Sequence, residues 1–183
     1  MKTRSQLFGG EFFFAFFIFM MILTIIFFMW SYTLREIRKS NDFVDMQETA
    51  VNIGEQLLRT PGNPENWTAA NAISVGLSNE SRNLVGDKIL RFIDMMDQSK
   101  YDNSCAGNIS NYYCSKYLLG VGKYDFHFQM TYLNGTVFQV YGRDAITGME
   151  AVNETNIITV QRSALYESQI VRIVLTLWYG GPT

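Results

Sequence analysis

One uninterrupted apolar run near the N-terminus limits what this chain can fold into. It extends from Phe12 to Trp30 and holds 19 residues, of which only Thr24 is clearly polar. As a helix at roughly 1.5 Å per residue, the run is about 28 Å long, close to the thickness of a bilayer's hydrocarbon core. No small-residue cleavage motif of the secretory type follows it. The run therefore predicts a membrane-spanning helix that stays in the mature protein.

A carboxylate, Glu11, stands directly before this run. Inside hydrocarbon a charge is costly unless another group compensates it. In a plain membrane anchor Glu11 would lie among the lipid headgroups at little cost. In a helix that assembles with copies of itself, it would pair with a neighbouring subunit. The residues alone leave both alternatives open.

The helical pattern continues well beyond the apolar run. In residues 31–60 apolar side chains recur mostly three, four or seven positions apart, at Leu34, Ile37, Val44, Val51 and Leu58. Charged residues occupy the opposite positions, and no proline occurs before Pro61. Because Thr60-Pro61-Gly62 is a strong stop signal, we expect one helix from Glu11 to Arg59. Its first half is apolar all round and its second half is amphipathic.

The remainder predicts an α+β head. A helix is expected over residues 84–96 and a polar loop over residues 101–116. Alternating residues predict four strands, over residues 124–132, 136–141, 156–166 and 169–179. Asn134-Gly135 favours a two-residue type I′ turn, but that register mixes apolar with polar partners, so either a bulge shifts it or both faces are partly covered. The last strand is apolar enough to be central and covered by a helix. We therefore expect a long helix packed on a four-stranded antiparallel sheet.

Two features after the apolar run favour an exported head. Five Asn-x-Ser/Thr sequons lie there, against about two expected by chance from 13 Asn and 25 Ser and Thr. Their acceptors are Asn66, Asn79, Asn108, Asn134 and Asn153. Cys105 and Cys114 enclose eight residues, a loop that a disulfide can close and that exported domains favour, although free thiols or a metal site are alternatives.

Charge and motifs exclude several function classes. The formal net charge of −2 gives no basic footprint for nucleic acid. The chain has no Gly-rich phosphate loop, no His-Glu-x-x-His and no Gly-x-Ser-x-Gly. The single histidine, His127, is expected on the polar face of its strand, and Asp94 and Asp97 on the solvated face of their helix. We therefore predict no enzyme, with no catalytic residues, no cofactor and no metal.

The N-terminal residues resemble those of archaeal type IV pilins with class III signal peptides. A basic leader with Lys2 and Arg4 precedes Ser5-Gln6-Leu7, and Glu11-Phe12 opens the apolar helix. Later stretches, such as Gln56 to Trp67 and Leu118 to Phe126, are similar to uncharacterised archaeal pilin-like proteins. If Gln6 starts the mature chain, Glu11 is its sixth residue. If Leu7 does, Glu11 is the fifth, as in the commoner archaeal pattern.

The resemblance implies leader processing near Ser5, Gln6 and Leu7, and assembly through Glu11 and Phe12. Residues 1–6 would be the leader, 7–30 the transmembrane and assembly helix, 31–60 its amphipathic continuation, and 61–183 the extracytoplasmic head. The expected function is a structural subunit of an archaeal type IV pilus-like surface filament. Its partners would be related pilin subunits, a prepilin-type peptidase, the assembly machinery and membrane lipids. The alternative is a single-pass, membrane-anchored extracellular binding module that does not polymerise.

Overall fold

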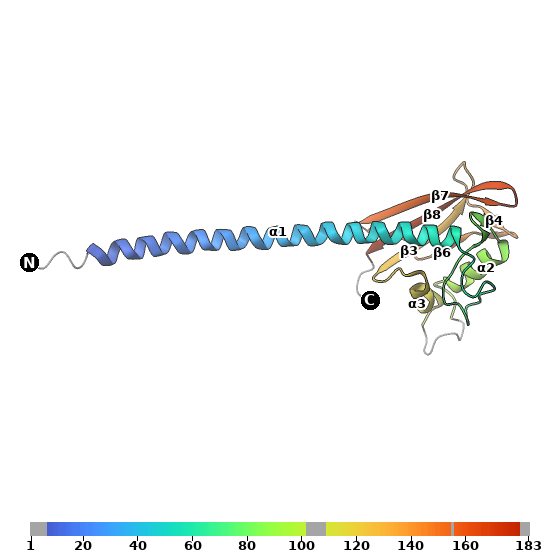
Figure 1. Ribbon diagram of the computed structural model, residues 1–183, viewed down its shortest axis with the longest axis horizontal. Coiled ribbons are helices and arrows are strands. Elements are labelled where there is room, and N and C mark those ends of the chain that lie inside the picture. The colour runs from blue at the N-terminus through green and yellow to red at the C-terminus, as the bar shows by residue number, and fades with distance from the viewer. Residues whose placement is uncertain (1–6, 102–108, 155, 180–183) are drawn as a thin grey trace, which may run out of the picture. The chain divides into compact units, whose positions relative to one another are not determined.

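The computed structural model describes residues 7–101, 109–154 and 156–179 (Figure 1). The chain forms two compact units, Met1–Val44 and Asp45–Thr183. The first contains the apolar part of the N-terminal helix. The second contains the last turns of that helix together with the α+β head.

Helix α1 spans Leu7–Arg59, which confirms the expected single helix. It ends where the stop signal predicts, because the Thr60 hydroxyl donates to the Gln56 carbonyl at 2.8 Å and Pro61 has no N–H to continue the ladder. Within the second unit, Met46, Ala50, Ile53 and Leu57 of α1 are buried. Their spacing of three and four places them on one face of the helix.

The head is built on a six-stranded mixed sheet in the order β1-β2-β7-β8-β3-β6. All neighbours are antiparallel except β2 and β7, which are parallel. The strands span Ser78–Glu80 (β1), Asn83–Leu84 (β2), Tyr124–Thr131 (β3), Ile146–Gly148 (β6), Ile157–Tyr166 (β7) and Gln169–Tyr179 (β8). The strands expected over residues 156–166 and 169–179 are confirmed as β7 and β8, which pair with each other, and the central position of β8 is confirmed. The expected four-stranded antiparallel sheet is wrong in strand number and in being purely antiparallel.

The difference arises in the segment after β3. Residues 136–141 do not form one long strand. They supply β4 (Gln139–Val140), which pairs with β5 (Arg143–Asp144) in a separate two-stranded sheet. The chain reverses at Tyr141-Gly142, both with positive φ, and β6 then pairs with β3. The very short strands β1 and β2 extend the opposite edge of the main sheet.

The turn after β3 is wider than a two-residue type I′ turn. Only Gly135 has positive φ there, and its N–H donates to the Tyr132 carbonyl at 3.0 Å. The bridge Thr131↔Val137 shifts the register by one residue from the two-residue expectation. Phe138 N–H then donates to the Met130 carbonyl at 2.8 Å, and both side chains are buried. The predicted alternative, a shifted register, is therefore the one that the fold adopts.

One face of the sheet holds the hydrophobic core of the second unit. Phe128 lies opposite Leu175, and Leu175 opposite Val160, and all three are buried. The last part of α1, drawn cyan to teal in Figure 1, lies across this face. A Cβ placed on Gly54 would lie 3.7 Å from Val160 Cγ1, so the helix backbone runs close to β7.

Helix α2, Gly86–Met95, covers the rest of that core and confirms the helix expected over residues 84–96. Its Phe92 ring meets the Phe128 ring edge-on, with centroids 5.0 Å apart. Lys88 of α2 is buried, and its Nζ donates to the carbonyls of Pro61 (2.9 Å) and Ser78 (3.1 Å). Burial lowers the pKa of this amine from its ordinary value. Lys88 thereby fixes the chain that leads from α1 to β1.

The described part of the expected polar loop 101–116 is partly helical. Helix α3, Asn111–Ser115, is followed by a 3-10 turn, Lys116–Leu119. The loop prediction is wrong for these residues because Tyr112 is fully buried against the Phe126 ring, with centroids 5.3 Å apart. Residues 102–108 lie outside the described part of the chain.

Candidate functional site

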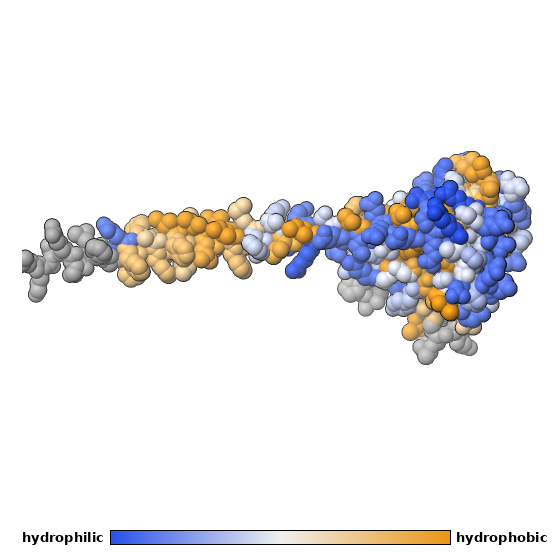
Figure 2. All heavy atoms as spheres, in the orientation of Figure 1, coloured by the Kyte–Doolittle hydropathy of each residue, from blue (hydrophilic) through white to orange (hydrophobic). Residues whose placement is uncertain are grey.

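The largest feature of the first unit is its exposed apolar surface. Every large apolar side chain from Phe12 to Trp30 is at least 43% exposed. Figure 2 shows this part of α1 as a continuous hydrophobic stretch. Among the described residues, α1 is the one helix long and apolar enough to cross a membrane. A soluble monomer rarely exposes a contiguous apolar surface of this extent, so lipid or other protein must cover it.

The threonine within this stretch and the one just after it are satisfied by the helix itself. Thr24 Oγ1 donates to the Met20 carbonyl at 2.7 Å, and Thr33 Oγ1 to the Met29 carbonyl at 2.9 Å. Neither hydroxyl needs water or a partner chain. Glu11, at the N-terminal edge, is exposed, and so is Phe12 beside it. Glu11 is therefore the charge that any covering environment must accommodate.

The predicted leader-processing residues are only partly visible. Ser5 and Gln6 lie outside the described residues, and Leu7 is the first residue of α1. After Trp30 the helix surface becomes amphipathic, and Leu34, Ile37, Phe43 and Val44 remain exposed. The apolar surface of the first unit thus continues past the length that a bilayer alone would cover.

One cysteine of the predicted disulfide, Cys114, lies in α3. Cys114 is disulfide-bonded. Cys105 lies outside the described residues, so its pairing with Cys114 stays a prediction. Beside it, Tyr112 Oη donates to Asp125 Oδ1 at 2.9 Å and accepts the Phe126 N–H at 3.0 Å. Lys116 Nζ lies 3.0 Å from the same Asp125 oxygen. Burial and the Asp125 charge raise the pKa of Tyr112, so its hydroxyl stays protonated and can donate.

Four of the five predicted glycan acceptors can be placed. Asn66, Asn79, Asn134 and Asn153 are exposed on the head, and Asn108 lies outside the described residues. Their settings differ. Asn66 is followed by the fully buried Trp67, whose Nε1 donates to the Gly76 carbonyl at 2.9 Å. Asn134 occupies the exposed turn after β3.

A partly polar hollow lies at the β3–β6 edge. It measures about 720 Å³, and its lining includes Asp97, Ser99, Tyr101, His127, Gly148 and Glu150. Burial lowers the pKa of His127, and the nearby Glu150 charge partly opposes that effect. The Asp97 carboxylate already accepts hydrogen bonds from the Ser99 N–H (2.8 Å) and hydroxyl (2.6 Å).

The lining of this hollow mixes acidic, hydroxyl and apolar side chains around His127. Within the described chain, no hydrogen bond links His127 to a nucleophile or carboxylate. No group of three His, Cys, Asp or Glu residues in that part of the chain is arranged to hold a metal ion.

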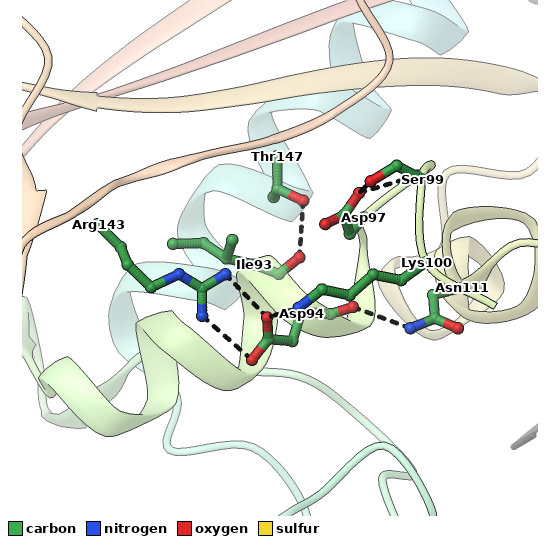
Figure 3. A network of polar contacts seen from close by, with 8 residues as sticks. All are labelled: Ile93, Asp94, Asp97, Ser99, Lys100, Asn111, Arg143 and Thr147. Atoms are coloured by element: carbon green, nitrogen blue, oxygen red, sulfur yellow. Dashed lines mark hydrogen bonds and ion pairs between the residues drawn. The ribbon is translucent and has the colours of Figure 1, made fainter. Parts of the chain in front are cut away.

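A network of polar contacts connects the C-terminal end of α2 to neighbouring elements (Figure 3). Asp94 binds the Arg143 guanidinium through both oxygens, at 2.9 and 3.4 Å, and also contacts Lys100. Asn111 Nδ2 donates to the Asp94 carbonyl at 3.1 Å, and Thr147 Oγ1 to the Ile93 carbonyl at 3.0 Å. Burial alone would raise the pKa of Asp94, but the bonds from Arg143 and Lys100 outweigh it and lower the pKa.

Asp94 is therefore not the freely solvated carboxylate that the helical pattern suggested. The network joins α2 to α3, β5 and β6, and its role is structural. Neither this network nor the Tyr112–Asp125 contacts could be found from spacing, because most of them join residues that are between 13 and 54 positions apart in the chain.

No protein family, curated protein sequence or solved structure was found to match this chain.

Proposed function

We propose that this chain is a structural subunit of an archaeal type IV pilus-like surface filament and that it assembles through its N-terminal helix. The observation that carries the proposal is the exposed apolar surface of α1 from Phe12 onward, which continues through Leu34 and Ile37 to Val44. Lipid tails cover a segment of bilayer length. The apolar side chains beyond Trp30 need a protein surface, and neighbouring copies of the same helix supply one.

Glu11 would set the register of the bundled helices. Removal of a leader near Ser5, Gln6 and Leu7 by a prepilin-type peptidase creates a new α-amine close to this carboxylate. A pair between Glu11 and the amine of a neighbouring subunit offsets the cost of desolvating both charges. The carboxylate is exposed at the start of the apolar stretch, where a neighbour can reach it. The assembly machinery would move each subunit from the membrane into the filament, with the head outside the cell.

A second candidate is a single-pass, membrane-anchored extracellular binding module that never polymerises. The polar hollow of about 720 Å³ beside His127 and Glu150 favours it, since its size suits a small-molecule ligand. In that case α1 would be a plain anchor and Glu11 would lie among headgroups.

Two measurements on the full chain in its native cells separate the candidates. Mass spectrometry of the N-terminus is expected to show the loss of five or six residues, and electron microscopy is expected to show filaments. Replacing Glu11 by Ala is expected to lower filament yield at least tenfold, while the control Glu36→Ala, an exposed charge on the same helix, leaves it unchanged. The head's resistance to protease serves as the folding control in both variants.

An intact Met1 together with an absence of filaments would support the anchored module. Normal filament yield from Glu11→Ala would refute the proposed charge pair.

A further inference from the structure

The turn after β3 holds one sequon in a conformation that the other described sequons do not share. Oδ1 of Asn134 accepts the Thr136 N–H at 3.0 Å and the Thr136 hydroxyl at 2.8 Å. The sequon Asn134-Gly135-Thr136 is therefore folded back on itself, with its hydroxyl already on the acceptor amide. Gly135 has a φ of +89°, and a Cβ placed there would meet nothing within 4 Å, so the turn projects into open space.

This geometry favours chemistry at the Asn134 amide nitrogen. An amide nitrogen is a poor nucleophile because its lone pair is delocalised onto the oxygen. Two hydrogen bonds to Oδ1 stabilise the negative charge that develops on that oxygen when Nδ2 loses a proton. Among the described contacts Nδ2 makes no hydrogen bond, and Asn134 is exposed, so an incoming group can reach the nitrogen.

The Asn66 sequon has the opposite arrangement. Its central residue, Trp67, is fully buried, and its Thr68 hydroxyl donates to Asn71 Oδ1 at 2.9 Å instead of to Asn66. An enzyme groove cannot enclose a sequon whose middle residue is fixed in the core. The required hydroxyl is also committed elsewhere.

Of the two other acceptors, only Asn79 lies in a fully described sequon, and it lacks the turn contacts. Asn79 belongs to strand β1, and no hydrogen bond between Asn79 and Ser81 occurs there. Asn153 has a φ of +58°, and its Thr155 lies outside the described residues.

We propose that the folded head presents Asn134 as its N-glycan acceptor and that Asn66 stays unmodified. The co-reactant is a lipid-linked glycosyl phosphate. Nδ2 attacks the anomeric carbon of the sugar, so a C–N bond forms and the C–O bond to phosphate breaks. The phosphate leaves with the electron pair, and a base of the transferase takes the Nδ2 proton. The inference rests on the export of the head that the proposed function requires.

The test is glycopeptide mapping of the full chain purified from the cells that export it. Trypsin releases residues 124–143, which contain Asn134 as their only sequon, and residues 60–82, which contain Asn66 and Asn79. We expect the first peptide to carry a glycan and Asn66 in the second to be bare. Thr136→Ala is expected to abolish the modification, and the matched control Thr68→Ala to leave the glycan mass of the chain unchanged. Gly135→Val keeps the sequon but disfavours positive φ, and is expected to lower occupancy at least threefold.

A bare Asn134, or a glycan on Asn66 with Asn134 bare, would overturn the inference. Unchanged occupancy in Gly135→Val would overturn the selection by turn geometry. Filaments built from subunits with a bare Asn134 would refute the glycan proposal and leave the proposed function standing. A chain that is glycosylated at Asn134 but never assembles would refute the proposed filament function and leave the glycan proposal standing.

Discussion

Replacing Tyr112 by Phe tests whether one buried hydroxyl attaches α3 to the sheet. Tyr112 and Phe126 are both fully buried. The Tyr112 hydroxyl accepts a hydrogen bond from the Phe126 N–H at 3.0 Å and donates one to the Asp125 carboxylate at 2.9 Å. The substitution removes one oxygen and keeps the ring that packs on Phe126. Any loss of stability therefore reports the hydrogen bonds and not the packing.

The expected loss of stability follows from the Phe126 N–H and the Asp125 carboxylate, which each lose a hydrogen bond in Tyr112→Phe. An orphaned buried N–H costs about 1–3 kcal/mol, and a lost hydrogen bond to a charged group costs about 1.5–3 kcal/mol. The two terms do not add fully, because Lys116 Nζ still lies 3.0 Å from Asp125 Oδ1 and supports the carboxylate. We expect the free energy of unfolding to fall by about 2–4 kcal/mol.

Urea unfolding of the full chain in detergent micelles measures this change. Tryptophan fluorescence suits the assay, because Trp67 and Trp178 are both buried in the head. With a slope of about 2 kcal/mol per molar urea, the midpoint is expected to fall by about 1–2 M. The matched control is Tyr113→Phe, since its hydroxyl contacts only Met149 Sδ, at 3.6 Å, among the contacts described. Equal midpoints for the two variants would refute the reasoning.

Two further predictions concern the head. The β7–β8 turn places Glu167 and Ser168 at φ of 47° and 67°, so Glu167→Asn with Ser168→Gly is expected to stabilise the fold by about 1 kcal/mol. Thermal unfolding measures this, with Ser163→Gly in strand β7 as a control that is expected to destabilise. Asp94 has a folded pKa below its usual 3.8, so its ion pairs stabilise the fold above about pH 4 and lose that effect as the pH falls further. Stability measured from pH 6 to 3 is expected to fall less steeply in Asp94→Asn, and parallel curves would contradict the assignment.

The features predictable from the sequence are those with a long, regular pattern. The apolar run and the helical spacing after it, with no proline before Pro61, predict α1 from Glu11 to its end at Arg59. Residue patterns predict β7 and β8, and the strongly apolar character of the last strand predicts its central place in the sheet. The short strands escaped prediction because two or three residues cannot show a period. Ser78–Glu80 is polar, and its Ser78 carbonyl accepts a hydrogen bond from the buried Lys88 of α2.

The candidate site likewise has features that the sequence predicts and features that depend on tertiary contacts. The apolar surface of α1 and the sequons can be read directly from the residues. The difference between Asn134 and Asn66 cannot, because it depends on the burial of Trp67 and on which oxygen each threonine hydroxyl meets.

The boundary between Val44 and Asp45 has a mechanical consequence. Residues 45–59 of α1 are part of the core that holds the head together, with Met46, Ala50, Ile53 and Leu57 buried in it. At the first residue of this unit, the Tyr124 hydroxyl donates to Asp45 Oδ2 at 2.7 Å. Further along, Arg162 Nε of β7 lies 3.0 Å from Glu55 Oε1. A force that reaches residues 45–59 therefore acts directly on side chains of the head's own core.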